Sequence, residues 1–132
     1  MSTTRAWLLD QVAQQRMSLA VAVGDADRYC GFITTTVLPA SSMLGTVWSI
    51  RDLYVTPGYR RAGIAGQLLQ HAVDNARAAG ALRVSLQTET DNTPALTLYT
   101  MAGFQPVHGL TLLNLTLVPK ETAWAHSIYD SK

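Results

Sequence analysis

Two adjacent arginines stand directly before a glycine-rich stretch of the chain. The stretch consists of Arg60, Arg61, Ala62, Gly63, Ile64, Ala65 and Gly66. An apolar run broken by Pro57-Gly58 precedes it, and a helical pattern of apolar residues follows it. The first N–H groups of a helix have no partner within the helix, and the helix dipole adds about half a positive charge there. Glycines let the backbone close around phosphate oxygens, so the stretch predicts a site for a phosphate-bearing ligand.

The flanking residues predict a strand–helix–strand unit that positions this stretch. Residues 46–55 form an apolar strand, and residues 82–87 alternate apolar with polar side chains, as a strand with one inward face does. Between them, residues 63–79 carry apolar side chains at helical spacing, and Gly80 stands where a helix ends. A connection of this kind joins parallel strands, so 82–87 is expected to lie parallel to 46–55.

The remaining elements are predicted from composition and from turn residues. Before the unit we expect a helix over 4–15 and a hairpin of two strands, 18–23 and 29–38, the second ended by Pro39. After it we expect a polar loop, then a helix over 95–102 capped by Asn92 or Thr93 and ended by Gly103. A closing hairpin of residues 104–107 and 110–118 follows, and then a polar tail over 119–132.

Composition restricts the class of protein. At 132 residues the chain is expected to form a single domain over 1–132, and 48% apolar residues with 14% charged residues indicate a globular fold. A net charge of +1 argues against a nucleic-acid-binding surface. The lone Cys30 is expected to be a small buried residue, and neither it nor the three histidines show metal-ligand spacing. From the spacing of these residues, no metal is expected. No stretch is long and apolar enough for a membrane span, so a cytoplasmic protein is expected.

General phosphate motifs do not match the glycine-rich stretch. The chain has no G-x-x-x-x-G-K-[ST] sequence, and residues 63–66 do not form G-x-G-x-x-G. The residues by themselves therefore indicate a phosphorylated cofactor at a helix N-terminus and leave its identity open.

Four blocks of the chain resemble the GNAT superfamily of acyl-CoA-dependent N-acetyltransferases. Residues 60–65 match the signature [RQ]-x-x-G-x-[GA], and residues 52–57 resemble the fourth strand of that family. Asn92 with residues 95–104 resembles its "N…A…LY…GF" segment, and residues 29–32 resemble a strand that often carries Gly-Phe. The resemblance extends from about Ser18 to Val107.

The resemblance implies an α+β fold of three layers. Its central mixed sheet is mostly antiparallel, its parallel central strands splay apart, and helices flank it. The implied reaction transfers the acetyl group of acetyl-CoA to a primary amine of a small molecule or peptide, by direct attack through a tetrahedral intermediate. The backbone of residues 60–66 would bind the pyrophosphate. Further residues implied to bind acetyl-CoA are Leu53, Tyr54, Val55, Asn92, Ala95 and Tyr99, and the N–H of Val55 or Leu53 would stabilise the oxyanion.

The resemblance places Tyr99 as the general acid, and the alternative is a tyrosine of the core. The general base is open. Relatives that acetylate polyamines often have a glutamate where this chain has Arg51, so Asp52 and Glu89 are the candidate carboxylates. Each could equally be solvated or a helix cap, and a water relay would leave no trace in the sequence. Arg51 also hints at an acceptor that carries a carboxylate or phosphate.

The chain departs from the family at its N-terminus, where only about 17 residues precede the first strand. The acceptor pocket is then either open or completed by another subunit, and a homodimer that exchanges the tail over 119–132 would cover the exposed edge.

Two alternatives to this function stay open. The acceptor amine could belong to a protein or a tRNA, or the chain could bind acyl-CoA as a sensor without turnover.

Overall fold

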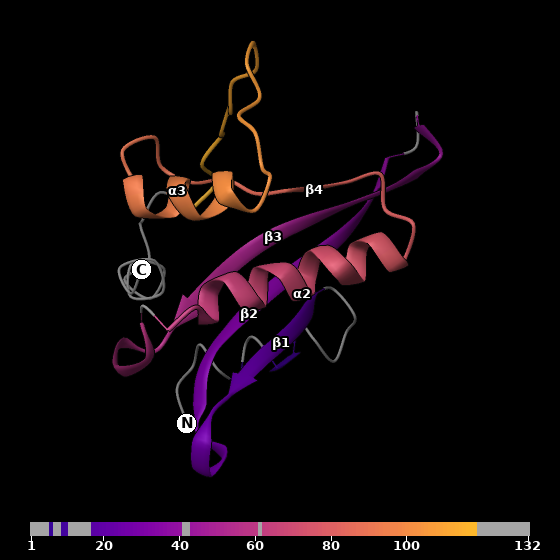
Figure 1. Cartoon of the computed structure of the whole chain (residues 1–132). Coiled ribbons are helices and arrows are strands. Elements are labelled where there is room, and N and C mark those ends of the chain that lie inside the picture. Colours follow the sequence, from indigo (N-terminus) through magenta and orange to yellow (C-terminus); the bar gives the residue numbers. More distant parts are fainter. Residues whose placement is uncertain (1–5, 7–8, 11–16, 41–42, 61, 119–132) are drawn as a thin grey trace.

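The computed structural model describes residues 6, 9–10, 17–40, 43–60 and 62–118. In this part of the chain, four strands form one mixed sheet in the order β1-β2-β3-β4. The strands are β1 (Ser18–Val23), β2 (Tyr29–Ala40), β3 (Gly45–Val55) and β4 (Arg83–Ser85). β1, β2 and β3 are antiparallel neighbours, whereas β4 is parallel to β3 (Figure 1). The predicted α+β fold with a mixed sheet and flanking helices is confirmed.

The hairpin of β1 and β2 forms where the sequence predicts it. A 3-10 turn, Asp25–Asp27, joins the strands, and both Ala26 and Asp27 adopt positive φ. The prediction that Pro39 ends the second strand is wrong, because β2 continues to Ala40. β1 pairs with β2 no further than Thr35, so among the described residues no strand pairs with the end of β2 on that side, where a proline is tolerated.

β3 and β4 pair along only three positions. The pairs are Val47 with Arg83, Trp48 with Val84 and Ser49 with Ser85, after which residues 50–55 of β3 have no strand beside them in the described chain. On its other side, β3 remains paired with β2 as far as Val55. The parallel order is as predicted, but the strand is shorter than the predicted 82–87 because the two strands separate beyond Ser85.

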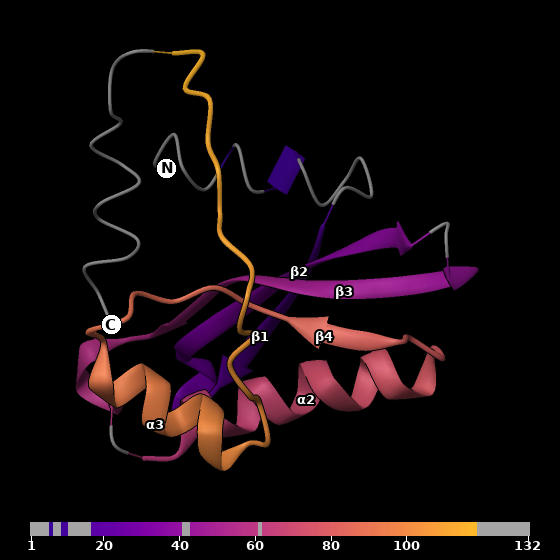
Figure 2. The ribbon, with the colours of Figure 1, turned by 90° about the horizontal axis from the view of Figure 1, so that it is seen from above.

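Two helices cover the same face of the sheet (Figure 2). α2 (Ile64–Ala78) agrees with the prediction to within a residue at each end, and Gly80 has the left-handed φ of +77° expected after a helix. α3 (Thr93–Met101) begins two residues before the predicted start, with Pro94 in its first turn.

The hydrophobic core lies between α2 and this face of the sheet. Its buried side chains are Ile33, Ile50, Leu68, Leu69 and Ala72. Leu53 from β3 and Leu98 and Tyr99 from α3 are partly buried against the same cluster. Cys30 is also buried, at 2% exposure, and is a free thiol, as its apolar neighbours predict. One packed cluster therefore holds together β3, the start of α2 and α3.

The predicted closing hairpin is wrong, because residues 104–118 form neither helix nor strand. They extend as a loop from the end of α3 (Figure 1), and most of their large apolar side chains are exposed. A strand of three residues gives a returning chain a very short edge to pair with. Of the predicted helix over 4–15, only Ala6, Leu9 and Asp10 are described, and these are helical. The tail over 119–132 lies outside the described residues.

Candidate functional site

The gap between β3 and β4 exposes backbone groups of β3. The N–H of Thr56 donates to the carbonyl of Cys30 at 2.7 Å, which makes these two residues a hydrogen-bonded pair of the antiparallel ladder. Alternate residues of such a strand turn their N–H and C=O groups to opposite sides. Leu53 and Val55 therefore turn theirs away from β2 and toward the gap, where an extended ligand can pair with them as an added strand does.

Arg60 lies at the mouth of this gap. Its Nε donates to the carbonyl of Val55 at 3.1 Å, so the side chain folds back over the end of β3. The guanidinium is exposed and holds a formal positive charge between the gap and the start of α2. Its neighbour Arg61, predicted to act beside it, lies outside the described residues.

The N-terminus of α2 is open, as the glycine-rich stretch predicts. Gly63 caps the helix with φ of +80°, no side chain caps the first N–H groups, and the first turn contains no acidic residue. A Cβ at Gly63 would meet nothing within 4 Å, so the glycine is required by its backbone conformation and not by crowding. The N–H groups of Ile64, Ala65 and Gly66 belong to this first turn, where anions bind.

Tyr99 packs on the helix-covered side of the sheet. It is half-buried and contacts Phe104 edge-to-face, with ring centroids 6.1 Å apart. Burial raises the pKa of the Tyr99 phenol above its ordinary value of 10.0. At neutral pH the phenol is therefore protonated, which is the form that a general acid needs.

Asn92 and Ala95 contact each other at the start of α3. The Oδ1 of Asn92 accepts the N–H of Ala95 at 3.3 Å, so Asn92 is the helix cap, one of the two caps predicted. The side-chain NH2 group is not used in this contact. Capping is compatible with a further contact between that NH2 group and a ligand.

Thr88 is a residue that the sequence did not single out. It follows β4 by three positions, where the strands have separated, and its buried Oγ1 has no hydrogen-bond partner within the described chain. A buried hydroxyl without a partner costs free energy, so a ligand group that reached this hydroxyl would be a favourable partner for it. A single threonine in a polar loop carries no sequence signal that could have identified it.

The two candidate carboxylates lie in different places. The Oδ2 of Asp52 accepts a hydrogen bond of 2.6 Å from the Oγ1 of Thr34 on β2. Since successive side chains of a strand alternate and Leu53 joins the core, Asp52 lies on the sheet face opposite the helices. Glu89 is exposed in the loop before α3, where its main-chain carbonyl accepts the N–H of Asn92 at 3.1 Å.

A β-bulge lies in β3 between Ile50, which joins the core, and Asp52. Thr34 pairs with Asp52 and Thr35 pairs with Ile50, so Arg51 is the extra residue of the bulge. Arg51 is exposed. Bulges redirect side chains locally, and this one places an arginine directly beside the candidate base.

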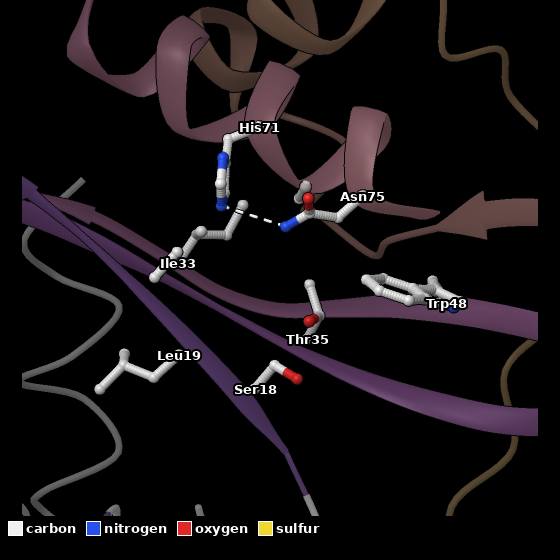
Figure 3. A pocket seen from close by; sticks show the side chains of 9 residues that line it. Ser18, Leu19, Ile33, Thr35, Trp48, His71 and Asn75 are labelled. Carbon is white, nitrogen blue, oxygen red and sulfur yellow. Dashed lines mark hydrogen bonds between the residues drawn. The ribbon is translucent and has the colours of Figure 1, made fainter. Parts of the chain in front are cut away.

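A small cavity of about 110 Å³ lies between α2 and the strands, away from the start of α2 (Figure 3). His71 and Asn75, which contact each other at 3.1 Å, reach over it from α2, and Trp48 lies on the sheet side. Its lining residues are Ser18, Leu19, Ala20, Ile33, Thr35, Trp48, His71, Ala72 and Asn75. None of the predicted site residues lines this cavity, and its volume is well below the 300–1,000 Å³ of ordinary ligand pockets.

The described residues contain no group of three or more histidine, cysteine or acidic side chains that could hold a metal ion. The helices found in that part of the chain are also too short or too polar to cross a bilayer.

An open strand edge beside a helix N-terminus without a side-chain cap is an arrangement suited to an extended ligand with an anionic end. The chain matches the model of the acetyltransferase (GNAT) family over residues 2–104. That match covers well over half of the sequence, and the chain belongs to this family.

Two curated relatives and one solved structure show the range of the similarity. Streptothricin acetyltransferase of Streptomyces lavendulae is 36% identical over 84 residues, which are 64% of this chain and 42% of the relative. Mycothiol acetyltransferase of Kocuria rhizophila is 30% identical over 90 residues, 68% of this chain and 30% of the relative. The crystal structure of a probable acetyltransferase superposes with a TM-score of 0.82 at 29% identity, covering 89% of this chain and 79% of that one. The chain thus spans less than half the length of these two curated relatives.

Proposed function

We propose that the chain transfers the acetyl group of acetyl-CoA to a primary amine of a small molecule. The observation that carries this proposal is the gap beyond Ser49, where the backbone groups of Leu53 and Val55 face away from β2 next to the open start of α2. Acetyl-CoA supplies an activated thioester at one end of an amide-containing arm and phosphates at the other. Family membership supports the choice of this donor.

The residues of the gap fit such a donor. Leu53 and Val55 offer N–H and C=O groups to the amides of the arm, and the buried hydroxyl of Thr88 offers a further partner. The first N–H groups of α2 bind the pyrophosphate, and the guanidinium of Arg60 adds charge at the same end. Asn92 contacts the arm through the NH2 group that its cap bond leaves free.

Acid and base act from the two faces of the sheet. The backbone N–H of Val55 stabilises the charge that develops on the carbonyl oxygen. The amine nitrogen attacks the acyl carbon to give a tetrahedral intermediate, and its collapse breaks the C–S bond. Asp52 accepts the proton that the amine loses, and Tyr99 gives its phenolic proton to the leaving thiolate. An amine with a pKa of about 10.4 needs such a base at neutral pH.

Glu89 is the second candidate for the base. It is exposed and no described contact orients its carboxylate, whereas Thr34 holds that of Asp52 at 2.6 Å. We therefore assign the role to Asp52.

A small-molecule acceptor is favoured by the names of the relatives. Two curated relatives are named streptothricin acetyltransferase and mycothiol acetyltransferase. The exposed Arg51 beside Asp52 would pair with a carboxylate or phosphate of the acceptor. A protein or tRNA acceptor stays an alternative, which an acceptor panel that includes both would reveal.

We also propose that the protein is a homodimer. Among residues 110–118, six large apolar side chains are 63–85% exposed, and this stretch contains no charged residue and no proline. A stretch of this kind pairs readily with another strand, so a second copy is the partner we expect to cover it. Light scattering should give a dimer that the double substitution Leu113→Lys with Leu115→Lys converts to monomer. Leu44→Lys, at a site that is 94% exposed, should leave it intact, and a monomeric wild type would overturn the dimer.

Thiol release from acetyl-CoA in the presence of an amine panel tests the function, with calorimetry of CoA binding in parallel. Turnover that requires both an amine and Tyr99 supports an acetyltransferase. Tight CoA binding without turnover on any amine would instead identify a sensor. The cytoplasmic location stays a prediction from the sequence.

A further inference from the structure

We propose that Thr34 is a positioning residue that holds the Asp52 carboxylate in the orientation needed to take a proton from the acceptor amine. The proposal rests on the proposed function, in which Asp52 is the base. It adds a residue of a neighbouring strand that neither the motifs of the sequence nor the family signature contains.

The contact between the two residues is short and comes from a rigid, buried donor. Thr34 is 0% exposed, and its Oγ1 lies 2.6 Å from the Oδ2 of Asp52. The two residues are directly paired across β2 and β3. A threonine side chain has few rotamers in a strand, so its hydroxyl fixes the direction in which the carboxylate can accept.

The hydroxyl of Thr34 determines which oxygen of Asp52 stays available. A threonine has a single hydroxyl proton, and donating it to Oδ2 requires that oxygen to be an acceptor. Oδ1 is then the oxygen left to receive the proton of the amine. Asp52 is only partly buried, so its carboxylate is not sealed within the core.

The choice of residue at position 34 is not explained by strand formation. Valine has nearly the same shape, forms strands equally well and would carry no hydroxyl to desolvate. Within the described residues, the bond to Asp52 is the one that offsets the cost of burying this hydroxyl. The adjacent pair on this face is aromatic, Phe32 with Tyr54 at 5.7 Å, so Asp52 stands between an apolar wall and the bulge at Arg51.

The neighbouring pair on the same face provides a matched control. Thr36 lies two residues along β2, on the same face as Thr34, and pairs with Ser49, which has no charge. A threonine-to-valine change at 36 therefore reproduces the chemical change at 34 without touching the candidate base.

The test is a double-mutant cycle on kcat at saturating acetyl-CoA, with Thr34→Val, Asp52→Asn and the double variant. We expect Thr34→Val to lower kcat about 10-fold, a part of the 10²–10⁴-fold that a positioned base contributes. Thr34→Ser, which keeps the hydroxyl, should stay within about twofold of wild type. In the Asp52→Asn background, Thr34→Val should have no further effect, since Thr34 acts through that carboxylate. Thr36→Val should leave kcat unchanged.

Two readouts separate positioning from a general loss of structure. CoA affinity by calorimetry should be the same in Thr34→Val and wild type. Thermal unfolding should show that Thr34→Val and Thr34→Ser are both folded at the assay temperature. The inference about Thr34 would be overturned if Thr34→Val lowered kcat equally with and without Asp52. It would also be overturned if Thr34→Ser folded but did not keep the wild-type kcat. Neither result would affect the proposed function. If Thr34→Val does not fold, Thr34→Ala, which also removes the hydroxyl, takes its place in the cycle. A wild type that binds CoA but acetylates no amine would overturn the proposed function as well.

Discussion

At the β3–β4 gap, the site consists mainly of backbone groups on one face of the sheet and of side chains on the other. On the side of α2 and α3, the site consists mainly of backbone, namely the N–H groups at the start of α2 and the free groups of Leu53 and Val55. On the opposite side it consists of side chains, with Asp52 bonded to Thr34 and the bulge residue Arg51 next to them. Backbone geometry needs particular glycines and a particular element order, whereas a side-chain site tolerates several residue types. The donor half can therefore be constant across a family while the acceptor half varies.

Gly63→Asp should have the largest effect, because it damages the backbone half directly. The substitution forces a side chain into φ of +80° and adds a negative charge at the N-terminus of α2. CoA affinity should fall about 100-fold, a loss of roughly 2.7 kcal/mol. Isothermal titration calorimetry measures it.

Gly63→Ala and Gly80→Ala separate the cost of backbone strain from the loss of CoA binding. Both glycines have nearly the same positive φ, +80° and +77°, and neither is crowded. Each alanine should cost about 1 kcal/mol of unfolding free energy. Only Gly63→Ala should also weaken CoA binding, and equal binding losses at the two ends of α2 would contradict an anion site at its start.

Tyr99→Phe should lower kcat about 100-fold and leave CoA affinity unchanged, since it removes only the proton donor. Tyr29→Phe, at a residue that is 71% exposed on β2, is the matched control. Because burial raises the pKa of Tyr99, the acid is protonated at neutral pH and is lost only as the pH rises through that raised value. Loss of this acid should therefore lower the wild-type kcat at alkaline pH, above the ordinary phenol value of 10.0. A phenylalanine variant that keeps the same alkaline limb would contradict the assignment.

Asp52→Asn and Glu89→Gln compare the two candidate bases. We expect Asp52→Asn to lower kcat about 100-fold and Glu89→Gln to change it less than twofold, because in the described chain only Asp52 is held by a neighbouring side chain. Steady-state kinetics at saturating acetyl-CoA gives both values. If Glu89→Gln lowered kcat more than Asp52→Asn, Glu89 in the loop before α3 would be the base. The assignment of the acetyl-CoA-binding residues would not change.

The difference between the two halves also explains what could be predicted from the sequence. The glycine at 63 and the helical spacing after it are local signals, and α2 begins and ends within a residue of its prediction. The contact between Thr34 and Asp52 joins residues 18 positions apart, and it depends on the register of two strands and a bulge. No local pattern records that register, and the same holds for the orphaned hydroxyl of Thr88.

The error at residues 104–118 has the same origin. The apolar run over 110–118, interrupted by two threonines and an asparagine, predicts a strand, but a strand forms only where an edge is available to pair with it. β4 has three residues, which is too short an edge for a segment of that length. The sequence records the tendency of the segment and not the presence of its partner.

Asn92 should give the smallest effect and the finest test, because it belongs to both the fold and the site. Its Oδ1 caps α3 through the N–H of Ala95, so Asn92→Ala should cost about 1 kcal/mol of unfolding free energy. Asn92→Asp keeps a capping oxygen but removes the NH2 group. If that group contacts the arm of the donor, Asn92→Asp should unfold at nearly the wild-type temperature and bind CoA about fivefold more weakly, as expected for the loss of one hydrogen bond. Unchanged CoA affinity in Asn92→Asp would restrict Asn92 to its capping role and leave Thr88 as the gap residue on that side for the donor arm.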